Sequence, residues 1–329
     1  MPAGVAVIVP VGDIFTNILD NEKTALYYTI TTVFIISSLA TTLLSGAFLL
    51  LSIMLWTHLK KMKFFWFLTQ LNSTVFILSA VNLFVNVPAT LHLLSKDVGT
   101  SITYILLTYL LDFCHYSILF SNTVIGLQRG FVFLFDTYAE RVFNKPLIYI
   151  WLSAPWVLPL LAEYFLFANA CAYEFDVYEY KIVLKCHSIN RGSLSLHTSN
   201  PVLIQIIDSA LHIMIPTLLF WIYLAIIVKI MKSKTNPMNK NEILILKQAI
   251  FVFVAFQSSS LVLLSAQYFK ITQVDAFLIK RFVNTMEILA GAATPAFFFF
   301  TSKEIRRLVT TRVTVPSSQT GSNIQVRAV

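Results

Sequence analysis

Seven long apolar stretches with few charges dominate the sequence, and they limit what this chain can fold into. They lie within residues 25–57, 64–94, 101–128, 146–170, 202–230, 243–269 and 276–300. A helix needs about 20 apolar residues to cross the hydrocarbon core of a bilayer. In lipid, every backbone N–H and C=O must be satisfied within the protein, and the strands of a membrane barrel are shorter and alternate in polarity. The pattern therefore predicts membrane-spanning helices.

The low charge of the chain supports the same prediction. Of the 329 residues, 57% are hydrophobic and 12% are charged, whereas soluble domains carry about 25% charged residues. We therefore predict an all-α fold, a bundle of seven transmembrane helices. This fold divides the chain into an extracellular segment of residues 1–24, the helical bundle of residues 25–301 and a cytoplasmic tail of residues 302–329.

Lysine and arginine are distributed unevenly over the two sides of the predicted bundle. One side, which includes the C-terminal tail, holds 16 of the 24 basic residues, and the other side holds 8, counted with Lys280 and Arg281. The richer side is expected to face the cytosol, so the N-terminus is predicted outside and the C-terminus inside. The net charge of +8 then suits loops that face anionic lipid and requires no nucleic-acid partner.

Several local motifs accompany this topology. Leu127–Phe131 reads Leu-Gln-Arg-Gly-Phe at the predicted inner end of the third helix, and Thr294–Phe298 reads Thr-Pro-Ala-Phe-Phe in the seventh. Lys303–Leu308 follows and is expected to form a short amphipathic helix. Pro216 lies inside the predicted fifth helix, and Trp156 lies 27 residues after the arginine of the first motif. With seven helices and an outer N-terminus, these features resemble the rhodopsin-like G-protein-coupled receptors.

The sequence lacks several of the usual motifs of those receptors, and these differences indicate which group of receptors it is most similar to. Arg129 alone is retained from the acidic–Arg–aromatic motif of the third helix. The sixth helix has no proline, the second has no acid near Val75, and the outer end of the third has no cysteine. With 28 phenylalanines and a Thr-Pro-x-x-Phe segment, the chain is most similar to the divergent nematode serpentine chemoreceptor classes.

The resemblance implies a chemosensory receptor in the plasma membrane, the sensory cilium included, that binds an extracellular small molecule and signals through a heterotrimeric G protein. Residues implied in activation and coupling are Arg129, Glu242, Lys247, Pro216, Thr294, Pro295 and Phe298. By resemblance, Arg129 is a latch that swings outward on activation, with Glu242 as a candidate partner at rest. A simpler interpretation, in which Arg129 snorkels to the membrane interface, stays open.

Ionisable side chains inside the predicted helices mark candidate functional positions, because burying them in lipid is costly. Asp112, His115 and Tyr116 are three and four residues apart, so they are expected on one helical face. By resemblance, such residues fall at the level of the ligand cavity, where acids would attract a cation or a hydrogen-bond donor. The predicted ligand-binding residues are Asp112, His115, Tyr116, Asp208, His212 and Glu287.

Two other interpretations of these polar residues stay open. They could form an interhelical network, for example between Asp112 and His212, that holds the third and fifth helices together. They could instead form a proton or cation relay in a transporter or channel subunit, with Asp112, Asp208 and Glu287 as its carboxylates.

The three cysteines have predicted structural roles, and the sequence carries no recognisable catalytic motif. Cys114 is predicted to be an inert packing residue inside the membrane. Cys171 and Cys186, 15 residues apart in the predicted second outer loop, are candidates for a disulfide. No Gly-x-Ser-x-Gly, no phosphate loop and no pair of histidines at metal-ligand spacing is found. We therefore expect no enzyme, no cofactor and no metal site.

Overall fold

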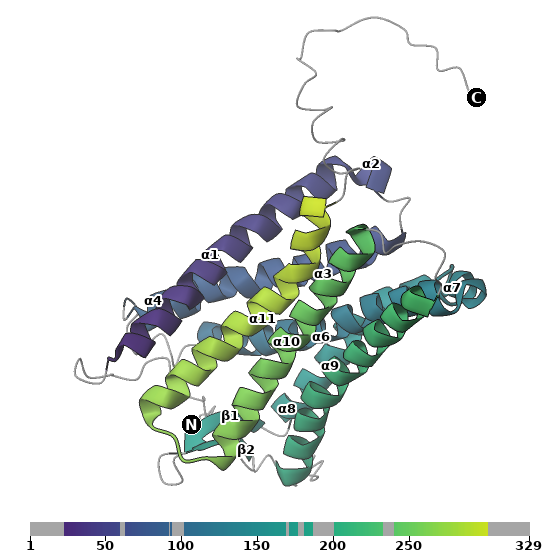
Figure 1. Ribbon diagram of the computed structural model, residues 1–329. Coiled ribbons are helices and arrows are strands. Elements are labelled where there is room, and N and C mark those ends of the chain that lie inside the picture. Colours follow the sequence, from purple (N-terminus) through teal and green to yellow (C-terminus); the bar gives the residue numbers. More distant parts are fainter. Residues whose placement is uncertain are drawn as a thin grey trace, which may run out of the picture.

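The computed structural model describes residues 23–59, 63–91, 93, 102–168, 171–176, 181–186, 201–232 and 240–301. Within these residues the fold is a bundle of long helices with short elements at its ends (Figure 1). Predictions for residues 1–22 and 302–329, including the amphipathic helix Lys303–Leu308, lie outside the described residues.

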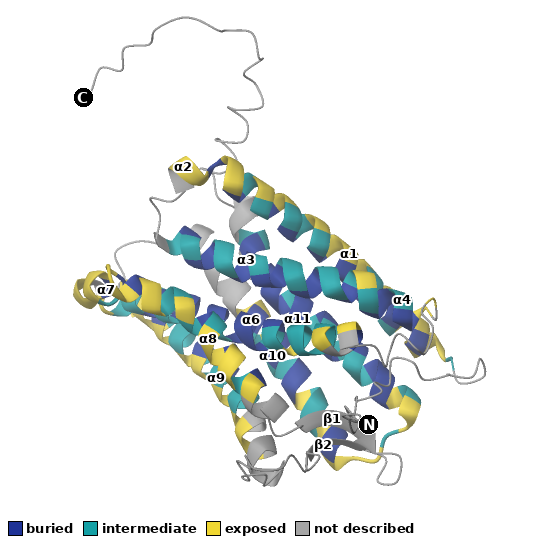
Figure 2. Ribbon diagram, turned by 180° about the vertical axis from the view of Figure 1, so that it is seen from behind, coloured by how far each residue is buried: buried dark blue, intermediate teal, exposed yellow. Residues whose placement is uncertain are grey.

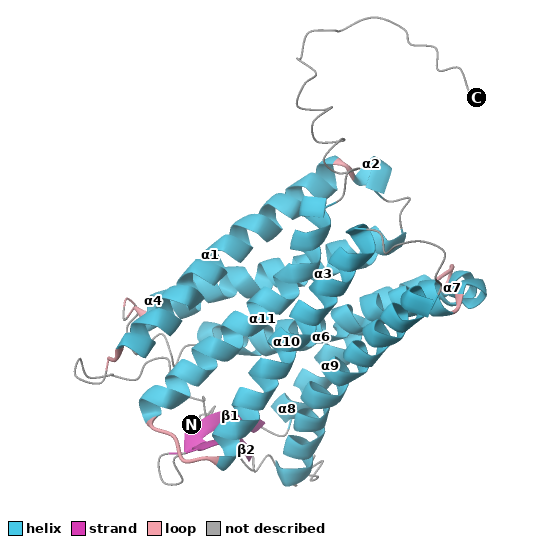
Figure 3. Ribbon diagram, in the orientation of Figure 1, coloured by secondary structure: helices cyan, strands magenta, loops and turns pink. Residues whose placement is uncertain are grey.

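Long helical segments follow one another along the chain at the predicted positions. They are α1 (Ala25–Met54), α3 (Lys63–Val81) continued by η3 (Asn82–Asn86) and α4 (Val87–Thr90), α6 (Ile102–Leu134), α8 (Leu147–Ala168), α9 (Pro201–Lys232), α10 (Lys240–Tyr268) and α11 (Gln273–Thr301). Short helices α2 (Trp56–Leu59) and α7 (Asp136–Val142) lie at one end of the bundle. A hairpin of β1 (Cys171–Asp176) and β2 (Lys181–Cys186) lies at the other end (Figure 3), and the all-α prediction did not include it.

Six of these segments are long and apolar enough to cross a membrane. They are Ala25–Met54, Phe64–Thr90, Leu106–Leu134, Leu147–Tyr164, Ala210–Lys229 and Ile250–Tyr268. The remaining long helix, α11, carries Asp275, Lys280, Arg281 and Glu287 and is not among them. The fold is therefore consistent with a multi-pass membrane protein. A seventh crossing and the orientation of the termini stay predictions.

The surface of α1 has the polarity that a lipid solvent favours. Its buried residues recur every three or four positions, and five of the eight are serine or threonine: Tyr27, Thr31, Phe34, Ser38, Thr41, Ser45, Phe48 and Ser52. Its exposed face carries large apolar side chains such as Leu43, Leu50 and Ile53 (Figure 2). Water would favour the reverse arrangement, whereas small polar residues between helices are typical of membrane bundles.

Polar side chains on α3 tie this helix to three neighbours. Asn72 donates to the Ser45 carbonyl of α1 at 2.9 Å, and Gln70 donates to the Leu152 carbonyl of α8 at 2.7 Å. The Thr74 and Ser117 hydroxyls lie 3.3 Å apart between α3 and α6. Because lipid offers no competing hydrogen-bond partners, such contacts fix which helices are neighbours.

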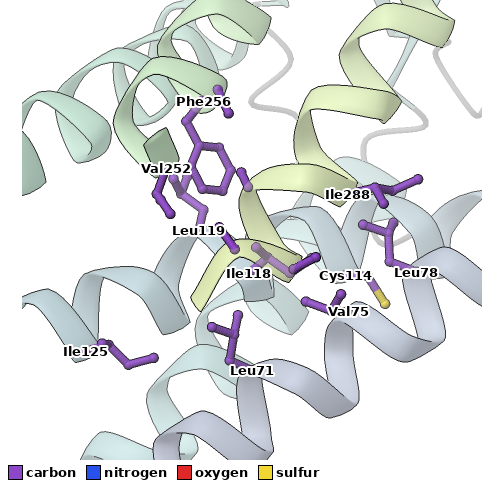
Figure 4. Packing of buried hydrophobic residues seen from close by; sticks show 14 of the residues in the cluster. Leu71, Val75, Leu78, Cys114, Ile118, Leu119, Ile125, Val252, Phe256 and Ile288 are labelled. Carbon is purple, nitrogen blue, oxygen red and sulfur yellow. The ribbon is translucent and has the colours of Figure 1, made fainter. Parts of the chain in front are cut away.

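Helix α6 is the central element of the bundle. It packs against α3, α8, α9 and α11. One apolar cluster spans these contacts, and Figure 4 shows Ile118 and Leu119 of α6 grouped with Val75, Phe256 and Ile288 from three other helices. All five of these side chains are buried, as is the free thiol of Cys114. Cys114 therefore lies in the packed core, as predicted.

A π-helical turn, η3, interrupts the second long helical segment just before Pro88. Proline has no backbone N–H and its ring crowds the carbonyl four residues earlier, so a regular α-helix cannot continue unchanged through it. A single wider turn accommodates the defect, and such turns are frequent at functional sites. Here the wider turn contains Asn82 and Asn86, both of which are buried.

Glycines mark the closest helix contacts. A Cβ atom at Gly291 of α11 would lie 2.7 Å from a Val75 methyl group and 3.1 Å from Ile118 Cδ1. On α6, Gly126 and Gly130 face Leu219 and Ile222 of α9 in the same way. Small residues four apart let two helices approach closely, a common arrangement in membrane bundles.

The Gly291→Ala variant is expected to lower stability despite the higher helix propensity of alanine. The new methyl group must displace Val75 and Ile118 in a packed core, which costs about 1–3 kcal/mol. Thermal unfolding of the purified protein in detergent measures the change. Gly46→Ala is the matched control and should lower the Tm less, because its Cβ would meet the Phe76 ring at 3.3 Å rather than 2.7 Å. An unchanged Tm for Gly291→Ala would contradict the packing argument.

The hairpin places two cysteines opposite each other. Cys171 and Cys186 are Cα partners in the antiparallel register of β1 and β2. Paired residues of antiparallel strands have Cα atoms about 4.5–5.5 Å apart, which lies within the range that a disulfide needs. Their side chains lie outside the described part of the chain, so the disulfide stays a prediction.

Thiol labelling under denaturing conditions tests this disulfide. Without reductant, one of the three cysteines should react, and after reduction all three should. Intact-protein mass spectrometry distinguishes the two results. Three reactive thiols without reductant, in protein isolated from an oxidising compartment, would exclude the bridge.

Candidate functional site

Three ionisable side chains from three helices form a chain of contacts inside the bundle. His115 of α6 lies between Glu287 of α11 and His212 of α9. Its Nδ1 atom is 3.1 Å from Oε1 of Glu287, and its Nε2 atom is 2.6 Å from Nε2 of His212. The side chains of His115 and Glu287 are 12% and 11% exposed. These three residues are the interhelical triad.

Aromatic rings enclose the two histidines. The imidazole rings stack with centroids 4.8 Å apart, and the buried Tyr116 ring lies 5.6 Å from His115 and 5.3 Å from His212. Phe256 of α10 approaches His115 at 6.4 Å. Apolar surroundings strengthen each polar contact, because little water competes for it.

The contacts restrict where the protons of the triad can sit. A neutral imidazole has one N–H donor and one nitrogen acceptor. The hydrogen bond of the triad joins the two Nε2 atoms, so one ring donates and the other accepts there, whereas His115 Nδ1 lies at ionic-contact distance from Glu287 without hydrogen-bond geometry. The triad therefore joins α9 to α6 by a hydrogen bond and α6 to α11 by a close ionic contact.

Helix α10 contributes a fourth contact, which follows from Pro216. Pro216 is buried inside α9 and has no N–H, so the carbonyl of the residue four positions earlier, His212, loses its helical partner. The Ser260 hydroxyl of α10 donates to this carbonyl at 3.0 Å. Its neighbours Ser258 and Ser259 instead donate back to carbonyls of their own helix, at 3.0 and 2.8 Å.

The structure brings together four of the six residues predicted to bind a ligand. His115, Tyr116, His212 and Glu287 form the site described above. The Asp208 side chain lies outside the described residues. Asp112 is exposed on α6, whereas Tyr116 is buried.

Asp112 therefore lies at a more exposed position than Tyr116, and its predicted role in ligand binding stays a prediction. Residues three or four apart on a helix point up to about 60° apart, and α6 has neighbours on several sides. Asp112 and the buried Glu163 of α8 both interact electrostatically with Tyr109, so Asp112 lies toward α8.

An asparagine cluster near Glu287 was not predicted from the sequence. The Asn82 side-chain oxygen accepts from Asn86 at 2.8 Å and from Asn284 of α11 at 3.4 Å. Asn284 lies three residues before Glu287, so the cluster and the triad occupy neighbouring turns of α11. The sequence signal that could have revealed this cluster is the spacing of four residues between Asn82 and Asn86 within an apolar run.

Arg281 lies inside α11 rather than in a connection. Thr272 and Asp275 cap the start of this helix with reciprocal backbone and side-chain hydrogen bonds of 2.8–3.1 Å. Arg281 is 1% exposed, and its guanidinium carbon lies 5.0 Å from the ring centroids of Phe34 and Phe277. Counting Arg281 with the loop charges was therefore wrong, because aromatic rings hold this cation within the bundle.

Arg129 forms a second polar contact between α6 and α9. Its guanidinium donates to the Tyr223 hydroxyl at 3.4 Å and lies 5.1 Å from the ring centroid of Phe64 in α3. Lys229 of α9 also donates to the Leu134 carbonyl of α6 at 3.1 Å. Arg129 is half-buried and joins three helices.

The other predicted activation residues are described in part. Pro216 and Pro295 are both buried within unbroken helices. The side chains of Glu242, Lys247, Thr294 and Phe298 lie outside the described residues, so their predicted roles stay predictions. Among the side chains that the structure describes, no group of three or more His, Cys, Asp or Glu could hold a metal ion.

The fold and the site define a helical bundle with apolar outer faces and ionisable contacts between helices. Residues 16–322 match the family described as "Protein of unknown function (DUF621)". The chain therefore belongs to the DUF621 family, and the match includes every helix and strand described above. No curated protein matches the chain.

The Ser260→Ala variant tests the link between α9 and α10. It leaves the His212 carbonyl without the partner that Pro216 makes necessary, which costs about 1–3 kcal/mol. Ser259→Ala is the control, because Ser259 is also buried but bonds within its own helix. Thermal unfolding in detergent should show a lower Tm for Ser260→Ala than for Ser259→Ala. Equal Tm values would show that the link adds no stability.

Proposed function

We propose that this protein is a chemosensory G-protein-coupled receptor that binds an extracellular small molecule at the plasma membrane. The observation that supports this proposal is the interhelical triad, which joins α6, α9 and α11 by direct side-chain contacts. A ligand that contacts these side chains would act on three helices at once. Stronger binding to one helix arrangement then shifts the population toward that arrangement.

The proposed topology has α11 as a seventh crossing. This helix packs between α1 and α10 and buries its ionisable residues Arg281 and Glu287 against the other helices. An ionisable side chain that faces the interior of a bundle is compatible with a transmembrane position. The excess of lysine and arginine on the side of α7 and the C-terminal tail supports a cytosolic location for that end. The hairpin end, which is nearer to the triad, is then extracellular.

Signal transfer is proposed to follow α6 and α9. Arg129 lies 14 residues after His115, about 21 Å along the helix axis. Its contact with Tyr223 connects α9 to α6 near the proposed cytosolic end, as the triad does near the other end. Separation of Tyr223 from Arg129 would open this end of the bundle to a G protein.

A proton-conducting membrane protein is the second candidate, because Glu287, His115 and His212 form one line of ionisable side chains in contact. Conduction requires polar groups or water on both sides of such a chain. One turn further along α6, Ile118 and Leu119 enter the apolar cluster with Phe256 and Ile288 (Figure 4). This cluster favours a receptor over a conductor.

Expression in a cell line with a G-protein dissociation sensor and a panel of volatile and soluble small molecules tests the proposal. Glu287→Gln should raise the concentration of an active compound needed for a response by about 10–100-fold. The reason is that it removes the carboxylate proposed to bind the ligand, and a charge-assisted hydrogen bond contributes about 1.5–3 kcal/mol. Arg129→Gln should abolish signalling while the protein still reaches the cell surface.

The control for this experiment is Glu140→Gln, which removes an exposed carboxylate of α7. It should leave the response unchanged. A proton current that requires Glu287 and does not depend on G protein would contradict the receptor proposal and support the conductor.

A further inference from the structure

The interhelical triad can hold only a limited number of protons in its observed geometry. With Glu287 ionised and both histidines neutral, the contact between the two Nε2 atoms has one donor and one acceptor, the His115 Nδ1 atom lies beside the carboxylate, and the net charge is −1. This form is compatible with the distances of 3.1 and 2.6 Å.

One additional proton is also compatible with the contacts. His115 becomes an imidazolium that lies in ionic contact with the Glu287 carboxylate and donates to His212 from Nε2. His212 then accepts at Nε2 and keeps its own proton on Nδ1. The net charge is zero, and a cation between a carboxylate and a neutral ring is favourable in a site with little water.

A second additional proton is not compatible. If both histidines are imidazolium ions, two N–H groups and two positive charges face each other across the 2.6 Å contact. The histidines must therefore move apart, and they lie on different helices.

The charged groups on the neighbouring elements are few. Helix α8, which packs against α6, carries the buried Glu163, and β2, which packs against α9 and α10, carries Lys181 and Lys185, whose side chains lie outside the described residues. Helix α10 between Ile250 and Tyr268 has no charged residue, and neither has the second helical segment between Phe64 and Thr90. Helix α6 contributes the Tyr116 hydroxyl and the exposed Asp112, one turn from His115. Helix α9 contributes Asp208, one turn from His212, with a side chain outside the described residues, and α11 contributes Glu287 and, six residues before it, Arg281.

We infer that the interhelical triad is a proton-controlled lock, which holds α6 against α9 with up to one additional proton and releases them when His115 and His212 are both protonated. Histidine is the side chain whose charge ordinarily changes between about pH 5 and 8, so this is the range over which the release is tested. The inference concerns the positions of helices, and it does not depend on the proposed receptor function.

Distance measurement between spin labels on α6 and α9 tests the lock directly. Leu106→Cys and Met214→Cys place labels on exposed positions of the two helices, whereas Cys114 is fully buried. The full chain in lipid nanodiscs is measured at about pH 7.5 and at about pH 5, which bracket the reference pKa of histidine. The distance should increase at low pH with His115 and His212 present. In His212→Gln, which keeps a polar side chain but cannot become an imidazolium, it should not change.

His58→Gln is the control for the loss of a histidine, because His58 belongs to α2, at the end of the bundle opposite the hairpin. In this variant the distance between the labels should increase at low pH as it does in the unsubstituted protein. An unchanged distance in the unsubstituted protein, or an equal increase in His212→Gln, would overturn the inference. Thermal unfolding provides a second readout that does not require labelling. The Tm should fall by several degrees more between the two pH values with the intact triad than with His212→Gln, and parallel curves would also overturn it.

Discussion

The structure depends on hydrogen bonds between helices in a solvent that offers none. In lipid, a polar side chain that lacks a partner on its own helix must find one on a neighbour. Asn72 meets the Ser45 carbonyl, Gln70 meets the Leu152 carbonyl, and Ser260 meets the His212 carbonyl. These bonds specify which helices are neighbours, whereas the apolar outer faces contribute little specificity, because lipid is as apolar as the side chains.

Prolines and polar residues act together under this constraint. Pro216 removes one helical hydrogen bond at His212, and the bond from Ser260 replaces it with a contact to another helix. The π-helical turn before Pro88 similarly exposes Asn82 to Asn284 of α11. Defects within single helices thus become contacts between helices, and both lie close to the triad.

The sequence predicted the helices better than it predicted their contacts. Apolar runs set the helix positions, so all the long helices were found, with α6 ending at Leu134, six residues beyond its predicted end near 128. Spacing along one helix suggested that Asp112 would join His115, but the direction in which each residue points depends on neighbours that one sequence does not reveal. His115, His212 and Glu287 were selected because ionisable groups in lipid are costly, whereas neutral Asn82 and Ser260 gave a weaker signal. The hairpin and the buried Arg281 were missed because they depend on pairing and packing far from the local sequence.

Helices α6 and α9 contact each other at several levels, and the nature of these contacts determines how they could move. Polar contacts lie toward both ends: His115 meets His212 at one, and Arg129 meets Tyr223 and Lys229 meets the Leu134 carbonyl at the other. Between them, Leu219 packs against Gly126 without any polar bond. Loss of the first polar contact leaves α9 attached at the apolar level, where rotation breaks no hydrogen bond. A change at the triad would then reach Tyr223 by rotation of α9 about Leu219, and no continuous polar path through the apolar core is required.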